Sequence, residues 1–187
     1  MDGRAASQLI KPRVEELTKR GIKCSVISAP NGAWDPNVFK HKRVFSLFPA
    51  GLKFELRHWI RREVQSKVLQ RIFLLFNSII LSPFAVIERI LIPLESQWSW
   101  FFGAFASGIS SVFINRNSIN LLYSTGGPVG GHLAGILLSK VFRIPCVCEI
   151  QDPLFFDSLE WRPKGRSKFL YGMIEKYILK NSDSTVF

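Results

Sequence analysis

The sequence is poor in cysteine. Its 187 residues include only Cys24, Cys146 and Cys148, without a C-x-x-C pair. Zinc sites and disulfide frameworks need paired or even-numbered cysteines, so the sequence predicts neither and suits a reducing cytoplasm. Cys146 and Cys148 stand two apart on an expected strand, and we therefore expect both to be small core residues on the same face.

Several motifs of nucleotide and metal chemistry are missing as well. The chain has no Gly-Lys-Ser/Thr phosphate loop and no G-x-G-x-x-G order, which argues against P-loop nucleotide hydrolases and dehydrogenases. It also has no Asp-x-Asp metal motif. The N-terminus lacks the apolar core of a signal peptide.

Acidic residues are scarce relative to basic ones. The chain has 25 Lys and Arg against 14 Asp and Glu, a net charge of +11, and 16 of the basic residues precede Glu95. Such a field suits nucleic acid, an anionic membrane surface or phosphorylated substrates. Because the sequence has no recognisable reading helix or RNA-binding motif, we expect no nucleic-acid partner.

The apolar runs are interrupted. Within Ile72 to Leu94, four residues break the run: Asn77, Pro83, Glu88 and Arg89. A membrane-spanning helix needs about 20 mostly apolar residues, so we expect a buried or membrane-dipping hairpin of helices here rather than a span. The next apolar segment, Trp98 to Ile114, contains Gly103 and Gly108, which suit close helix packing.

The most informative stretch is Asn120 to Pro153. Leu121 to Tyr123 is an apolar run typical of a parallel strand, and apolar residues then recur at helical spacing up to Pro145. A second strand follows, which makes a βαβ unit. In such units ligands sit beyond the carboxyl ends of the strands, here the turns Ser124 to His132 and Glu149 to Pro153.

The run YSTGGPVGGHLAGILLSKVFRIPCVCEIQDP resembles the acceptor-side domain of family 4 glycosyltransferases. Glu149, Gln151, Asp152 and Pro153 stand where that family has its acidic-x-(Arg or Gln)-Asp-Pro sequence. The resemblance implies an α/β fold, a Rossmann-like parallel sheet with helices on both faces, which forms the N-terminal half of a GT-B fold. Residues 1–187 would be one such domain, incomplete at both ends, with a basic and apolar helical insert at about 53–114.

The resemblance also implies an activity. It implies sugar transfer from a nucleotide-sugar donor to a lipid-linked or polysaccharide acceptor in cell-envelope glycan synthesis, without a metal ion or cofactor. The donor would be bound mainly by a second domain that this sequence does not contain, and this chain alone would be inactive. The protein would be cytoplasmic and peripheral at the inner face of an anionic membrane.

We expect two sets of site residues at the strand ends. Free N–H groups near a helix start can receive a phosphate or sugar hydroxyl, and neighbouring polar groups can bind the acceptor. We assign substrate binding to Thr125, Gly126, Gly127, Gly130, Gly131, Glu149 and Gln151. We assign catalysis to His132 and Asp152 as proton-transfer groups. The alternatives are that the glycines only permit a tight turn and close packing, that His132 is a packed or capping residue, and that Asp152 caps a turn.

A third set concerns the membrane. The expected helix Glu55 to Gln65 places aromatic and aliphatic residues on one side and basic residues on the other. We assign membrane binding to Arg57, Trp59, Arg61 and Arg62. The alternative is a surface helix with a solvated charged face. A non-catalytic basic domain that binds membranes or a partner protein is therefore the competing function.

The remaining pattern gives four further elements. Ser7 to Arg20 is expected to be a helix that stops at Gly21, and Cys24 to Ser28 a strand. Val44 to Phe48 is expected to be a second strand after a polar, basic linker at Lys40 to Arg43. Ser167 to Leu179 is expected to be the last helix.

Overall fold

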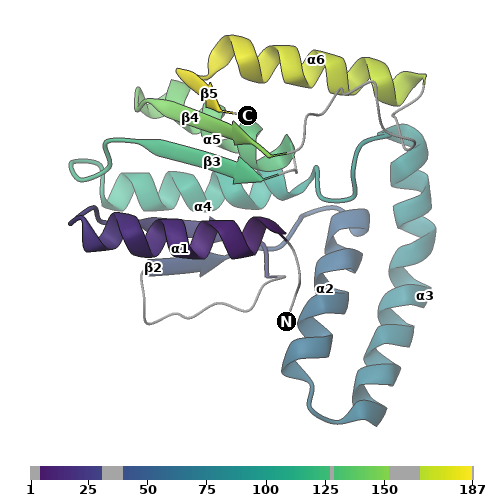
Figure 1. Cartoon of the computed structure of the whole chain (residues 1–187). Coiled ribbons are helices and arrows are strands. Elements are labelled where there is room, and N and C mark those ends of the chain that lie inside the picture. Colours follow the sequence, from purple (N-terminus) through teal and green to yellow (C-terminus); the bar gives the residue numbers. More distant parts are fainter. Residues whose placement is uncertain (1–4, 31–39, 127–128, 152–164, 187) are drawn as a thin grey trace.

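The computed structural model describes residues 5–30, 40–126, 129–151 and 165–186 of the chain. Within these ranges six helices and five short strands make a mixed α/β protein, as the sequence predicts (Figure 1). The helices are α1 (Ala5–Lys19), α2 (Pro49–Glu63), α3 (Lys67–Leu91), α4 (Trp100–Ile114), α5 (Val129–Phe142) and α6 (Arg166–Asn181). The strands are β1 (Ser25–Ser28), β2 (Lys40–Arg43), β3 (Leu122–Gly126), β4 (Cys146–Ile150) and β5 (Ser184–Val186).

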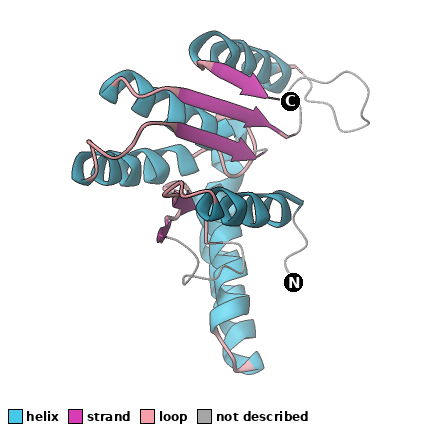
Figure 2. Ribbon diagram, turned by 60° about the vertical axis from the view of Figure 1, so that its left-hand side comes forward, coloured by secondary structure: helices cyan, strands magenta, loops and turns pink. Residues whose placement is uncertain are grey.

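The strands form two parallel sheets. β1 pairs with β2, and a larger sheet has the order β3-β4-β5. Parallel neighbours need a crossover connection, which α5 supplies between β3 and β4 and α6 between β4 and β5. The expectation of a single sheet is wrong for the described strands, since none of them joins the two sheets (Figure 2).

The position of the second strand also differs from the prediction. The strand is Lys40–Arg43, the segment expected to be a linker, and it pairs with Ser25–Ser28 in register. Val44 adds one more bond of this ladder, from its N–H to the Ser28 carbonyl at 2.9 Å. Ser46 does not continue it, because its N–H donates to a carboxylate oxygen of Glu55 at 2.6 Å. A side chain from α2 therefore ends the strand that β propensity alone would extend.

Several local predictions are confirmed. α1 ends two residues before Gly21, whose φ of +82° is the left-handed conformation of a helix C-terminus. The N–H of Ile22 then bonds back to the Leu17 carbonyl at 3.0 Å. β1 and α6 lie within a residue or two of their predicted bounds.

The core lies on one face of the larger sheet, under α5 and α6. Its buried cluster consists of Ile136, Cys146, Cys148, Ile150 and Ile178. Both cysteines are fully buried, and their sulfur atoms lie 4.0 Å apart. The prediction that they are small core residues on the same face is confirmed.

Helix α4 packs closely against α5 through a glycine. A Cβ atom on Gly108 would lie 2.3 Å from Leu138 Cδ1, so a larger residue there would require the Leu138 side chain to move. A Cβ on Gly103 would lie 2.6 Å from the Phe45 carbonyl oxygen, a backbone atom. The predicted close packing of this segment is confirmed.

Helices α2 and α3 form an antiparallel pair that extends away from the sheets, here called the α2–α3 hairpin (Figure 1). The expected break within residues 72–94 is wrong, because α3 is one 25-residue helix that continues through Pro83. The polar residues that interrupt the apolar run contact α2 instead: Asn77 Nδ2 donates to the Lys53 carbonyl at 3.0 Å, and a Glu88 oxygen accepts the Ala50 N–H at 2.7 Å. By length and composition α3 is able to cross a membrane.

Candidate functional site

Four polar side chains line the face of β3 and β4 that is turned away from the core. Alternate residues of a strand point to opposite faces, so Tyr123 and Thr125 share one face of β3. Thr125 is paired in register with Glu149 of β4, whose side chain lies on the same face, and Gln151 follows at the strand end. The strands thus bring three of the predicted substrate-binding residues together, namely Thr125, Glu149 and Gln151.

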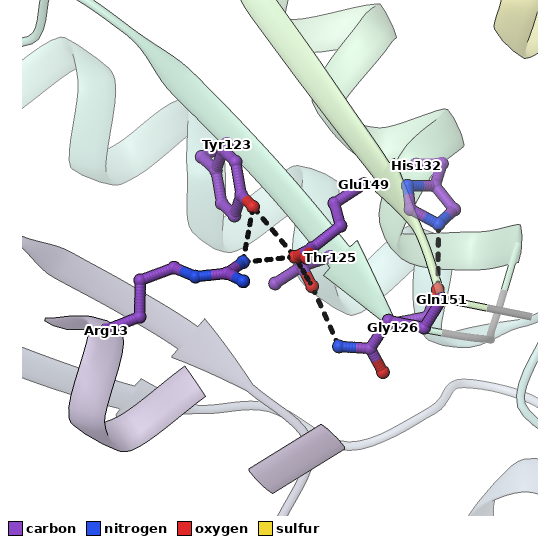
Figure 3. A network of polar contacts seen from close by, with 7 residues as sticks. All are labelled: Arg13, Tyr123, Thr125, Gly126, His132, Glu149 and Gln151. Atoms are coloured by element: carbon purple, nitrogen blue, oxygen red, sulfur yellow. Dashed lines mark hydrogen bonds and ion pairs between the residues drawn. The ribbon is translucent and has the colours of Figure 1, made fainter. Parts of the chain in front are cut away.

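Hydrogen bonds converge on one carboxylate oxygen, Glu149 Oε2. It accepts the hydroxyls of Thr125 at 2.6 Å and Tyr123 at 2.7 Å, and Arg13 Nη1 of α1 lies 2.5 Å away. Arg13 Nη1 also contacts the Tyr123 hydroxyl at 2.6 Å, and Gln151 Nε2 donates to Thr125 Oγ1 at 3.2 Å. We call these five residues the Glu149 cluster (Figure 3).

The cluster strongly favours an ionised Glu149. Burial alone raises the pKa of this carboxyl, but the bonds from Arg13, Thr125 and Tyr123 and the Arg13 charge outweigh burial and lower the pKa to about 2. Burial and the bond to Glu149 raise the pKa of Tyr123 to about 12, so its hydroxyl stays protonated. The bond to Glu149 likewise raises the pKa of Arg13.

This arrangement fits hydroxyl recognition better than proton abstraction. A carboxylate with a pKa of about 2 is a weak base near neutral pH. Among the described residues, no donor reaches its second oxygen, Oε1, while the side chain keeps 12% of its surface exposed. An oxygen of this kind can accept a hydrogen bond from a ligand hydroxyl, next to the hydroxyl and amide groups of the same cluster.

His132 lies on the opposite face of the sheet from this cluster. It is 1% exposed, and both ring nitrogens are engaged. Nε2 donates to the Gly126 carbonyl at 3.0 Å (Figure 3), and Nδ1 accepts from Ser124 Oγ at 2.8 Å. The carbonyl can only accept, which fixes the proton on Nε2. His132, which the sequence analysis assigned to the strand-end site, does not face the Glu149 cluster, because its position on α5 turns the side chain toward Ser124 and the core. This geometry favours the packed histidine; the catalytic assignment remains untested.

The start of α5 is already occupied by a side chain of the protein. The Val129 N–H donates to Glu95 Oε1 at 2.9 Å, so a carboxylate takes one of the helix N–H groups that the sequence analysis offered to a phosphate. Tyr171 of α6 holds the other Glu95 oxygen at 2.6 Å. Burial and the Glu95 charge raise the pKa of Tyr171, so its hydroxyl remains a donor.

The glycines of this turn serve packing and backbone conformation where they are described. A Cβ on Gly130 would lie 2.7 Å from the Trp98 carbonyl oxygen. The lack of a Cβ therefore lets α5 approach the start of α4. Gly126 has a φ of +125°, which only glycine adopts readily. A Cβ on Gly131 would make an ordinary contact with the Trp100 ring at 3.5 Å, so close packing does not require glycine there. Gly127 and Asp152 lie outside the described residues, and their roles stay predictions.

The predicted membrane-binding residues lie on α2, which begins six residues earlier than expected and ends at Glu63. Arg57 and Arg61 are exposed, and Trp59 is 39% exposed. Arg62 is half-buried and bonds to Glu63 Oε1 at 2.8 Å and to the Pro30 carbonyl at 3.2 Å. Three of the four assigned side chains are therefore accessible, while Arg62 also joins α2 to the end of β1.

Sequence reasoning missed Arg13, Tyr123 and Glu95 as site residues. Arg13 is 136 residues from Glu149 in the sequence, and nothing in its local pattern signals the contact. Tyr123 carried a signal, because strand alternation places it on the same face as Thr125. Within the described ranges, no group of three or more His, Cys, Asp or Glu side chains is placed to hold a metal ion.

Comparisons with protein-family models, curated proteins and solved structures give no match to this chain.

Proposed function

We propose that this chain is the acceptor-side domain of a glycosyltransferase, a Rossmann-like N-terminal half of a GT-B fold. It would help move a sugar from a nucleotide-sugar donor to a lipid-linked or polysaccharide acceptor in cell-envelope glycan synthesis. The observation that carries the proposal is the Glu149 cluster at the carboxyl ends of β3 and β4, where parallel sheets with crossover helices bind ligands. The resemblance of residues 123–153 to family 4 glycosyltransferases supports the same function.

In this function Glu149 orients the acceptor and does not remove its proton. Its ionised Oε1 accepts an acceptor hydroxyl, while Thr125, Tyr123 and Arg13 hold Oε2 in place. Gln151 offers an amide beside the same position. The general base is then a different group, and Asp152 keeps that predicted role. The donor would be bound by a second domain, without a metal ion, in a cytoplasmic protein peripheral to the membrane.

The test is acceptor binding by the purified chain. A water-soluble, short-chain prenyl diphosphate sugar is titrated into the protein and followed by calorimetry. We expect Glu149→Gln and Thr125→Val to weaken binding about tenfold or more, since each removes a hydrogen bond to or around a charged group. The matched control is Glu16→Gln, which removes an exposed carboxylate of α1 that pairs with Arg20. Unchanged binding by both cluster variants would contradict the site.

A second candidate is a non-catalytic domain that binds a membrane or a partner protein. The exposed apolar residues of α3 favour it, with Ile79 and Ile90 exposed by 62% and 66%. This candidate predicts no acceptor binding at any concentration and no role for Glu149. Two results together would support this second candidate. The first is that the wild type binds no acceptor. The second is that changing Arg57 and Arg61 abolishes membrane attachment while Glu149→Gln leaves it unchanged.

A further inference from the structure

About half of the circumference of α3 is an unbroken surface of exposed apolar side chains. At 100° per residue they fall within an arc of roughly 180°. Each is between 43% and 67% exposed. We call this surface the α3 apolar face; its residues are Val68, Leu69, Ile72, Phe73, Leu75, Phe76, Ile79, Ile80, Phe84, Val86, Ile87, Ile90 and Leu91.

Three polar side chains of α3, those of Gln70, Asn77 and Glu88, point the other way, toward α2. Gln70 Nε2 donates to the Arg61 carbonyl at 3.1 Å, Asn77 reaches the Lys53 carbonyl, and Glu88, 6% exposed, accepts the Ala50 N–H. A helix on the surface of a water-soluble domain has the reverse polarity, with its apolar stripe inward. Helix α3 therefore turns these polar side chains toward α2 and its large apolar side chains outward, as expected of a helix whose outer face contacts lipid.

Basic residues border the apolar face. Lys67, Arg71 and Arg89 are exposed and fall within about 40° of one another on the helix, along one edge of the arc. The one acidic residue of α3, Glu88, is buried against α2. Apolar side chains flanked by Lys and Arg, without an exposed carboxylate, complement acyl chains beneath anionic headgroups.

We propose that the α2–α3 hairpin is a monotopic membrane anchor, in which α3 lies parallel to an anionic bilayer with its apolar face in the boundary between headgroups and acyl chains. The face extends over about 35 Å of helix at 1.5 Å per residue, without a polar interruption, which suits a flat lipid surface. The anchor does not depend on glycosyl transfer. The membrane contact is thus on α3, which contains most of the segment predicted from the sequence to be a buried or membrane-dipping hairpin, whereas the residues assigned to membrane binding lie on α2.

Charge decides between an in-plane helix and one that crosses the bilayer. Bonds to α2 occur along α3 from Gln70 to Glu88, so α2 accompanies α3 over most of its length. A crossing α3 would carry Lys53, Arg57 and Arg61 of α2 into the hydrocarbon, where charged side chains are strongly disfavoured. With α3 in the plane of the interface, the same residues stay outside the hydrocarbon.

Flotation with vesicles tests the face. The full chain is mixed with vesicles of phosphatidylcholine and phosphatidylglycerol, and the variant replaces Ile72, Ile79 and Val86 by Ser. Each lost side chain weakens partitioning by roughly tenfold, so we expect at least about a hundredfold loss in the partition coefficient. The matched control replaces Phe113, Ile114 and Leu121 by Ser, which are 75%, 78% and 52% exposed outside α3, and keeps wild-type binding. Equal flotation of both triple variants, at wild-type helicity by circular dichroism, overturns the proposal.

Salt dependence and oligomeric state distinguish lipid insertion from attachment by charge alone and from self-association. High salt is expected to weaken binding without abolishing it, because apolar burial is not screened. Complete loss of binding in high salt would mean attachment by charge alone.

Sedimentation without lipid is expected to give the same mass for the wild type and the α3 variant. A wild-type dimer that the α3 variant dissociates, in a protein that does not float with vesicles, would assign the face to a second copy.

Depth measurements distinguish lying from crossing. Single spin labels at Val68, Ile79 and Ile90, which follow one line along the apolar arc, are placed in a Cys24→Ser background; Cys146 and Cys148 are buried. Accessibility to oxygen and to a water-soluble nickel complex then reports depth by electron paramagnetic resonance. We expect the three labels to lie at one depth. A label at position 79 far deeper than those at 68 and 90 would show a crossing helix and overturn the in-plane anchor.

Discussion

Replacing Glu149 by Gln tests whether the Glu149 cluster holds a true charge. The change keeps the shape of the side chain and removes the carboxylate that Arg13, Thr125 and Tyr123 contact. The folded protein lowers the pKa of this group from 4.5 to about 2. At about 1.4 kcal/mol per unit of pKa, the charge contributes at most roughly 3 kcal/mol to the free energy of unfolding. Because Arg13 is 41% exposed and water screens its charge, we expect about 1–2 kcal/mol.

The direction of the pH dependence follows from the lowered pKa. A carboxylate with a depressed folded-state pKa stabilises the protein fully above its unfolded pKa, here 4.5. The contribution is lost as the pH falls from 4.5 toward 2, because the folded protein resists protonation that the unfolded chain accepts. The difference in unfolding free energy between wild type and Glu149→Gln should therefore be largest at neutral pH and shrink through this acidic range.

Urea denaturation followed by circular dichroism measures this difference. The control is Glu16→Gln, since Glu16 and Arg20 form an exposed pair on α1 that contributes only a few tenths of a kcal/mol. A wild-type advantage that is constant with pH, or that grows as the pH falls, would refute the argument that the donors around Glu149 stabilise its charged form. Loss of the same amount in Glu16→Gln would show a general charge effect instead.

Two further substitutions probe buried hydrogen bonds. Glu88→Ala removes the carboxylate that accepts from Ala50 N–H at 2.7 Å and Trp98 Nε1 at 2.8 Å. We expect thermal or urea unfolding to show that the free energy of unfolding falls by about 3–5 kcal/mol, with a smaller loss in Glu88→Gln. A loss below about 1 kcal/mol would contradict the role of Glu88 in joining α2 and α3. His132→Ala leaves Ser124 and the Gly126 carbonyl without their partner and opens a cavity. We therefore expect the free energy of unfolding to fall by about 2–4 kcal/mol in the same assay. Unchanged stability would argue against a packed role for His132.

The parts of the fold that the sequence predicts are those set by local pattern. The βαβ unit from Leu122 to Ile150 and the stop of α1 near Gly21 depend on residues a few positions apart, which hydrophobic spacing and glycine conformation describe well. Cys146 and Cys148 follow from strand alternation in the same way.

The failures arise where distant residues decide the local structure. Ser46 leaves the strand ladder because Glu55 takes its N–H, and α3 passes through Pro83 because it packs along α2. The residues next to Pro83 in the sequence do not reveal the contact with α2. A prediction from sequence alone therefore gives too much weight to the helix-breaking tendency of proline. Arg13 reaches Glu149 across 136 residues for the same reason, since tertiary packing and not propensity brings them together.

The base of the α2–α3 hairpin is joined to the part of the fold that carries the Glu149 cluster. Ser167 Oγ of α6 donates to the Pro93 carbonyl at 2.7 Å, and Arg166 reaches the Leu91 carbonyl at 3.3 Å. Glu95, two residues beyond Pro93, holds both Tyr171 of α6 and the first N–H of α5. These bonds attach the base of the α2–α3 hairpin to α5 and α6, the two helices that cover the larger sheet, and so restrict its movement relative to that sheet. If α3 lies in the bilayer interface, these bonds set the orientation of the Glu149 cluster relative to the membrane, and the proposed function requires that this orientation present the cluster to a membrane-held acceptor.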